Sequence, residues 1–255
     1  MVDFVTFCYP GDYRQLHHPG WLDKVVKGHS FPFTNVYVLH QGMNGIDYPP
    51  LPDYVKIVPV DETVIEKYIK LPDEDAEKFT GPPNRAHYYL KHVRNHAMGL
   101  EVSQADYILF QDADVFLKED ESDMTRSWIT IGMEILQTNP DVLVVCPHWG
   151  GADCIVSSHP WGWKCNRYSQ QIFLCERQRL KSMDWGSTWD WEHLPDGGPL
   201  QEYWGMLEGR MDRYARIHGL YRAAVNSHRY WHTQSGKCFP GDVSRDEFLR
   251  SYLNP

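Results

Sequence analysis

Short apolar runs alternate with amphipathic stretches along the first 150 residues. Runs rich in Val, Ile, Phe and Tyr, bounded by turn residues, predict strands at 2–8, 34–40, 54–60, 106–110 and 141–147. Apolar residues at helical spacing predict helices at 21–28, 61–70, 86–102 and 127–137. Strands that alternate with helices indicate an α/β fold, a Rossmann-type layered arrangement in which helices flank a central, mostly parallel sheet.

The pattern changes after residue 147. Seven of the 10 tryptophans lie in residues 148–204, among many Gly, His and Pro residues. A helix is expected over residues 199–219, ended by Gly219, and a strand and loop follow at 221–237. The 255 residues show no internal repeat, so we expect a single domain.

Two carboxylates follow the apolar run at 106–110, in the order Asp112-Ala113-Asp114. An uncompensated buried carboxylate costs several kcal/mol, so these side chains either reach solvent or meet a positive charge. Aspartates at i and i+2 of an extended segment point to the same side. They are suitable ligands for one Mg²⁺ or Mn²⁺ ion. The plain alternative is that Asp112 caps a helix and Asp114 is exposed.

Charge and hydropathy narrow the function classes. Apolar residues make up 42% of the chain, enough for a sizeable core, and the net charge of −9 disfavours a polyanionic partner. A local basic strip would be formed by Arg177, Arg179, Lys181, Arg210, Arg213 and Arg216. The sequence shows no membrane-spanning run and no secretory signal pattern at its start, so we expect a cytoplasmic protein.

The six cysteines are spread along the chain, and their spacing does not predict a disulfide framework. We therefore expect reduced thiols. One stretch combines two histidines with two cysteines, which would suit zinc, although it lacks a compact Cys-x-x-Cys pair. Its residues are His148, Cys154, His159 and Cys165.

Residues 94–114 read RNHAMGLEVSQADYILFQDAD. This stretch resembles the GT-A class of nucleotide-sugar glycosyltransferases, particularly the family-2-like enzymes, in which an Arg-Asn helix start and a strand precede a D-x-D. The resemblance is good over residues 84–120 and looser elsewhere. It implies a nucleotide-sugar-binding half at 1–120, an acceptor-binding half at 121–255, a Mn²⁺ or Mg²⁺ ion, and a UDP- or GDP-sugar as donor.

The resemblance also implies a ligand set for the metal. Asp112 and Asp114 would hold the ion, and GT-A enzymes often add a late histidine, for which His232 is the candidate and His228 the alternative. The segment from His232 to Lys237 is also similar to the retaining family-8 pattern, in which the lysine meets the diphosphate.

Further donor-binding residues follow from the same resemblance. Tyr9 lies where the base or ribose is often held, and Asp61, after the third predicted strand, is the candidate for an acidic residue that holds the base. Arg94 and Asn95 belong to a helix whose donors would meet a phosphate or a sugar hydroxyl. Asp112 is included among the donor-binding residues as well as the metal ligands.

The run GGPLQEYWGMLEGRMD at 197–212 resembles the acceptor-side motif of inverting members, in which a Trp-Gly precedes an acidic pair. Glu208 is the first candidate for the general base and Asp212 the second, because Gly209 interrupts the expected pair. The plain alternative is that both carboxylates are exposed and pair with Arg210 or Arg216. Stereochemistry stays open, since this motif favours inversion and the late His-Gly-Lys pattern favours retention.

Three other functions compete with the transferase. A nucleotidyltransferase would share the layered sheet, but residues 8–16 offer one glycine and one arginine where a Gly-rich phosphate loop is expected. A non-catalytic sugar-binding module would bind donor without turnover. A glycosyltransferase that acts on a modified nucleic-acid base would need the basic strip.

Overall fold

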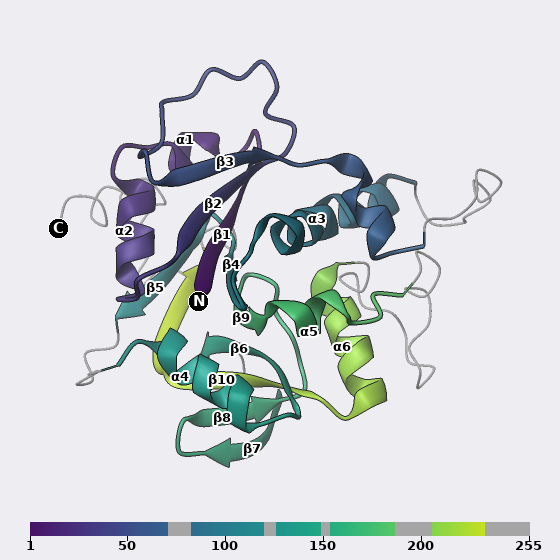
Figure 1. The fold of residues 1–255 in the computed structure, drawn as a ribbon. Coiled ribbons are helices and arrows are strands. Elements are labelled where there is room, and N and C mark those ends of the chain that lie inside the picture. The colour runs from purple at the N-terminus through teal and green to yellow at the C-terminus, as the bar shows by residue number, and fades with distance from the viewer. Residues whose placement is uncertain (71–82, 120–125, 149–153, 187–205, 233–255) are drawn as a thin grey trace, which may run out of the picture.

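The computed structural model describes residues 1–70, 83–119, 126–148, 154–186 and 206–232 (Figure 1). The strands formed by these residues are β1 (Val2–Cys8), β2 (Asn35–His40), β3 (Val55–Pro59), β4 (Tyr107–Gln111), β5 (Val115–Glu119), β6 (Val142–His148), β7 (Ile155–His159), β8 (Gly162–Cys165), β9 (Ile172–Glu176) and β10 (Tyr221–His232). The helices are α1 (Tyr13–Leu16), α2 (Trp21–Gly28), the 3₁₀ helix η1 (Glu62–Lys67), α3 (Pro83–Val102), α4 (Trp128–Thr138), α5 (Arg177–Lys181) and α6 (Leu207–His218).

The described strands form one ten-stranded sheet in the order β3-β2-β1-β4-β9-β6-β10-β8-β7, with β5 also paired to β10. Strands β1 to β4 pair in parallel, and so do β6 and β10. Strand β9 lies antiparallel between β4 and β6, so that β6 regains the direction of β4. Followed through every pairing, seven of the ten strands run one way, and β5, β8 and β9 run the other.

Helices cover both faces of this sheet, as Figure 1 shows for α2 and α3 on opposite sides of β1 and β2. Strand β1 is buried throughout, and its side chains alternate between two cores. Val5 and Phe7 face the core completed by α3 and α6. Phe4 and Cys8 face the core completed by α2 and α4. The layered α/β fold expected from the alternating pattern is therefore confirmed.

One contact fixes how close α3 lies to β4. Gly99 of α3 sits against the ring of Phe110, and a Cβ atom at this position would overlap that ring. The helix therefore packs nearer to the sheet than a larger residue would allow. Val5 of β1 lies against the same glycine, so α3 packs on β1 and β4 together.

The structure corrects several sequence expectations. The helix expected at 61–70 is a 3₁₀ helix at Glu62–Lys67, and within 199–219 the described helix covers Leu207–His218. Gly219 ends that helix with a left-handed backbone at φ 65°, as expected. Strands β7, β8 and β9 were not expected, because short strands in a Trp-rich, mixed stretch carry little periodicity, and the short strand β5 directly after the Asp112-Ala113-Asp114 turn was not expected either. No described helix has the length and apolar character to cross a membrane.

Candidate active site at the carboxyl ends of β1 and β4

The sheet order reverses between β1 and β4, since β2 and β3 extend from one side of β1 and β4 lies on the other. In open α/β sheets, ligands bind outside the carboxyl ends of the strands at such a reversal. Tyr9 follows β1 here, and Asp112 follows β4. The two sequence segments singled out for donor binding therefore meet at one edge of the sheet.

The Asp112-Ala113-Asp114 segment is a tight turn between β4 and β5, not the extended strand end assumed from the sequence. The amide of Val115 donates to the carbonyl of Asp112 at 3.1 Å, and the amide of Asp112 donates to the carbonyl of Gln171 at 2.8 Å. The turn thus directs both aspartates through its own backbone bonds and through the segment before β9.

Two glutamine side chains hold the backbone of this turn. Gln15 Nε2 donates to the carbonyl of Ala113 at 3.0 Å, and Gln111 Nε2 donates to the carbonyl of Val115 at 2.9 Å. Gln111 is fixed in turn by His29, whose Nε2 lies 2.7 Å from Oε1 of Gln111. These glutamines were not anticipated, because a buried amide carries no sequence pattern of its own.

Carboxylates converge on this turn. Burial raises the pKa of Asp112 well above its usual value, and the negative charges of Asp114, Asp12 and Glu208 raise it further, in that order. Asp114 is only 4% exposed. A hard divalent cation prefers carboxylate oxygens and would offset this repulsion, although the described carboxylates do not bring three ligand atoms within 4.8 Å of one another. Asp12 was not a sequence candidate, although its Pro-Gly-Asp turn directly follows β1.

The late histidine is placed by strand register. His232 pairs with Val115, the residue after Asp114, whereas His228 pairs with Glu119 at the far end of β5. The two positions differ by about 13 Å along the strand, so the backbone favours His232 as the one near the aspartates. The side chains of both histidines lie outside the described residues, as does all of Lys237.

Glu208 lies in the first turn of α6 and is partly buried. Burial raises its pKa to about 7, and Asp212 adds to the rise, while a hydrogen bond from the amide of Gln170 and the charge of Arg222 oppose it. That amide lies 3.3 Å from Oε2. A carboxylate that titrates near neutral pH is suited to general acid or base catalysis.

Asp212 lies one turn further along α6 and is buried. Its Oδ2 accepts a hydrogen bond from Nε of Arg216 at 2.9 Å, the i, i+4 ion pair that the plain alternative foresaw. The guanidinium of Arg210 donates to the carbonyl of Trp185. The two acidic candidates therefore differ in their surroundings: the charge of Glu208 acts on Asp112, and Asp212 pairs with Arg216.

Tyr9 and Asn95 are in direct contact. Asn95 Nδ2 donates to the hydroxyl of Tyr9 at 2.5 Å, and that hydroxyl also lies 3.1 Å from Nδ1 of His92. Asn95 is fully buried, and its Oδ1 has no hydrogen-bond partner among the described residues. The helix α3 therefore holds the residue that follows β1.

The two remaining donor-binding candidates lie near η1. Asp61 is fully exposed and caps this helix, accepting hydrogen bonds from the amide and hydroxyl of Thr63, which lower its pKa. Arg94 is mostly buried, with Nη1 3.9 Å from Oε2 of Glu62. Its Nε has no hydrogen-bond partner within the described part of the chain. One donor of Arg94 is thus buried without a partner among the described residues, whereas one oxygen of Asp61 serves the cap.

The basic strip expected as a polyanion surface divides in two: its α5 residues contact neighbouring elements, while on α6 Arg216 is exposed and Arg213 is partly exposed. Arg177 donates to the carbonyl of Leu100, and Arg179 to those of Val142 and Pro140. Lys181 pairs with Glu101. These cations hold α5 against neighbouring elements, so they offer little charge to a phosphate backbone.

The zinc hypothesis for residues 148–165 finds no support in the described residues, where the only His, Cys or carboxylate group of metal-site spacing is Cys8, His17 and His40. Instead, His159 stacks on Trp161, and His148 packs on Trp163. The five described cysteines are free thiols, as expected from the sequence, and Cys238 lies outside the described residues.

No protein-family model and no curated protein matches the chain. Among solved structures, a galactosyltransferase LgtC with donor and acceptor sugar analogues gives a TM-score of 0.43 at 12% identity, covering 88% of this chain and 73% of its own. Glucosyl-3-phosphoglycerate synthase from Mycobacterium tuberculosis with Mn²⁺ and UDP gives 0.41 at 13% identity, covering 100% and 78%. Mannosyltransferase PcManGT from Pyrobaculum calidifontis with GDP-Man and Mn²⁺ gives 0.45 at 11% identity, covering 88% and 54%. At such distant similarity, function has to be argued from the chain's own residues.

Proposed function

We propose that the protein is a metal-dependent glycosyltransferase that moves a sugar from a nucleoside-diphosphate sugar to an acceptor hydroxyl with inversion. The observation that carries this proposal is the position of Glu208, a carboxylate with a pKa of about 7 whose charge acts directly on Asp112 of the D-x-D turn. In this proposal, Glu208 is the base and the carboxylates of the turn bind the metal, at the sheet edge where α/β proteins bind ligands.

The donor would lie along the carboxyl ends of β1 and β4. We assign the nucleoside to Tyr9, held by Asn95, and its diphosphate to the D-x-D side, with Arg94 and Lys237 as cationic partners. Asp112, Asp114 and His232 are the proposed ligands of Mn²⁺ or Mg²⁺. When bound, the ion would supply positive charge to the departing diphosphate.

The chain's own residues perform the remaining steps. Glu208, deprotonated, accepts the proton of the acceptor hydroxyl while the acceptor oxygen bonds to the anomeric carbon. The bond from that carbon to the diphosphate oxygen breaks, and the electron pair leaves with the nucleoside diphosphate. Attack on the face opposite the leaving group inverts the anomeric centre. The hydrogen bond from Gln170 keeps Oε2 oriented during this transfer.

The test is release of nucleoside diphosphate from a panel of UDP- and GDP-sugars, with Mn²⁺, Mg²⁺ or a chelator. We expect release from one donor with a divalent ion, loss of release with chelator, and loss in Asp114→Asn. The anomeric configuration of the isolated product, read by proton NMR, tests inversion. Donor binding with no turnover under every acceptor condition would instead support a sugar-binding module, and absence of both metal and donor binding would refute the proposal.

A further inference from the structure

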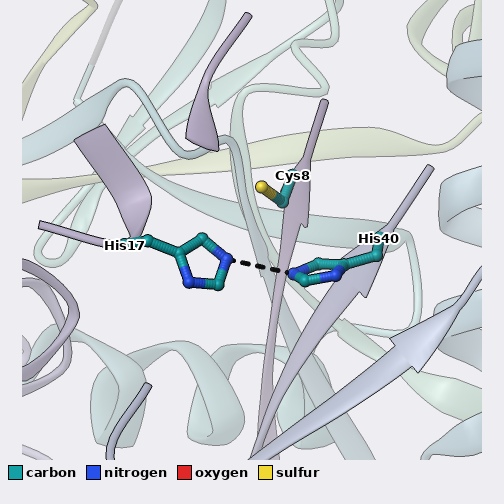
Figure 2. Close-up of side chains that lie close together, drawn as sticks. All are labelled: Cys8, His17 and His40. Atoms are coloured by element: carbon teal, nitrogen blue, oxygen red, sulfur yellow. Dashed lines mark hydrogen bonds between the residues drawn. The ribbon is translucent and has the colours of Figure 1, made fainter. Parts of the chain in front are cut away.

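A second group of ligand-type side chains lies on the α2 side of the sheet. Cys8 is the last residue of β1, His40 is the last residue of β2, and the two are register partners in adjacent parallel strands. His17 follows α1 and points toward both, as Figure 2 shows. All three are buried, with exposed fractions of 0%, 6% and 1% for Cys8, His40 and His17.

The distances within this group approach those of a tetrahedral metal site. Nε2 of His17 lies 3.2 Å from Nε2 of His40, and all three potential ligand atoms lie within 4.8 Å of one another. Bonds of 2.0–2.1 Å from zinc to each imidazole nitrogen place those nitrogens about 3.3 Å apart in a tetrahedron, and a nitrogen and a thiolate about 3.6 Å apart. The histidine pair already has this separation, and Cys8 Sγ needs to move by about 1 Å at most.

A fourth soft atom stands at the edge of the group. Met43 Sδ lies 3.9 Å from Cys8 Sγ. Imidazole suits zinc and copper, while thiolate together with thioether selects cuprous copper. The ligand types here are thus nitrogen and sulfur, in contrast to the carboxylate oxygens of the D-x-D turn.

The second ring nitrogen of His17 is already oriented as in known metal sites. Nδ1 of His17 lies 2.7 Å from the carbonyl of Pro49, to which it donates, so the other ring nitrogen presents its lone pair toward His40. Metal-bound histidines almost always donate their remaining N–H to a carbonyl or carboxylate. Tyr48 packs against both imidazole rings, with centroids 4.4 Å from His17 and 4.9 Å from His40, and limits their rotation.

We propose that Cys8, His17 and His40 form a second metal site, distinct from the D-x-D turn, for a thiolate- and imidazole-preferring ion, Zn²⁺ or Cu⁺. The ion would link the ends of β1 and β2 to α1 and to the segment of Pro49. Tyr9 is adjacent to Cys8 in the chain, so the ion would also stiffen the segment that we assign to the nucleoside. The site does not depend on that assignment.

The test uses the full-length chain carrying Asp112→Asn and Asp114→Asn, so that the carboxylate ligands do not contribute. The protein is reduced, exposed anaerobically to Zn²⁺ or Cu⁺, desalted, and analysed for metal per chain by elemental mass spectrometry. We expect about one equivalent retained. Competition with a chromophoric chelator should show at least a 10-fold weaker affinity after Cys8→Ser or His40→Gln.

Two further variants test whether binding is specific to this site and which ion it prefers. Cys175→Ser removes another buried thiol, in β9 on the other core, and should leave the affinity unchanged. Met43→Leu should weaken Cu⁺ binding and leave Zn²⁺ binding unchanged, which separates the two ions. Retention of no metal, or equal affinity in Cys8→Ser and its parent, would overturn the proposal.

A measurement on the chain without substitutions at Cys8 covers the case in which the variants fail to fold. Bound metal should slow alkylation of Cys8 in mild denaturant, mapped by peptide mass spectrometry, more than that of Cys146 and Cys175, which metal slows only through the stability of the whole fold. Equal alkylation of Cys8 with and without metal would refute the site even if Cys8→Ser is unstable.

Discussion

The amide of Gln170 donates to Oε2 of Glu208 at 3.3 Å, so the candidate base is attached to the segment that precedes β9. The next residue, Gln171, accepts the amide of Asp112 through its carbonyl at 2.8 Å. Two successive residues therefore join the base on α6 to the D-x-D turn after β4. This backbone bridge connects the candidate base to the turn that carries the two candidate metal ligands.

Replacing Glu208 with Gln should remove the base and keep its size. We expect kcat to fall by about 100- to 10,000-fold, the usual contribution of a positioned general base. In the unsubstituted enzyme, kcat/KM should rise with pH through about 7, because the base acts only when deprotonated, and this rise should vanish in the variant. The control is Asp212→Asn, since Asp212 pairs with Arg216. An equal fall in kcat in this control would contradict the assignment of Glu208 alone as the base.

Glu208→Gln should lower activity but raise the free energy of unfolding. The folded-state pKa of Glu208 is about 7 against a usual 4.5, so between these values the folded chain keeps a proton that the unfolded chain has released. The free energy of unfolding therefore falls as pH rises from 4.5 through 7. Glu208→Gln should be more stable than its parent at pH 8, with a smaller gain at pH 5, by urea unfolding. A gain independent of pH would contradict the raised pKa.

Asp112 should make stability depend on the divalent ion. Its pKa is raised by burial and by neighbouring carboxylates, so in chelator its charge destabilises the folded chain, and Asp112→Asn should raise Tm at pH 8. Mn²⁺ at 100 times its Kd stabilises a protein by about 2.7 kcal/mol, and this gain should appear in the parent and be lost in the variant. Scanning calorimetry with and without Mn²⁺ measures both; a Tm rise with Mn²⁺ in Asp112→Asn would remove Asp112 from the ligand set.

Gln15 should act as a positioning residue through the carbonyl of Ala113. Gln15→Ala leaves that carbonyl without its donor and loosens the turn that carries both aspartates. We expect Mn²⁺ affinity, measured by calorimetric titration, to fall about 10- to 100-fold, as for other residues that orient ligands. His18→Ala, at an exposed neighbouring position, is the control. Unchanged affinity in Gln15→Ala would show that the backbone bonds suffice to hold the turn.

Replacing Gly99 even with alanine should destabilise the folded protein. Alanine favours a helix by about 1 kcal/mol over glycine, but its Cβ would overlap the ring of Phe110, and overpacking costs about 1–3 kcal/mol. We expect Gly99→Ala to lower the free energy of unfolding. In Phe110→Leu, where the ring is gone, the same change should cost less or stabilise, which a double-mutant cycle measures. An equal cost in both backgrounds would place the strain elsewhere.

The sequence by itself determined the elements with strong periodicity. The apolar runs predict β1, β2, β4 and β6, and Gly219 predicts the end of α6. The position of Asp112 directly after β4 is also predicted from the sequence. These features are local, because side-chain period and turn chemistry depend on neighbours within a few residues. His232 was the first candidate for a late histidine ligand and His228 the alternative, and strand register places the backbone of His232 nearer to the aspartates.

Only the tertiary structure decided which of these elements meet. Strand β9 enters between β4 and β6 in the reverse direction, and this insertion carries Gln170 and Gln171 to the D-x-D turn. Cys8, His17 and His40 gather because β1 and β2 are neighbours and α1 folds over their ends. Burial and the approach of other carboxylates shift the pKa values of Asp112 and Glu208, and both depend on groups far apart in the chain. Periodicity fixes which face of an element is buried, but packing chooses the partner that buries it.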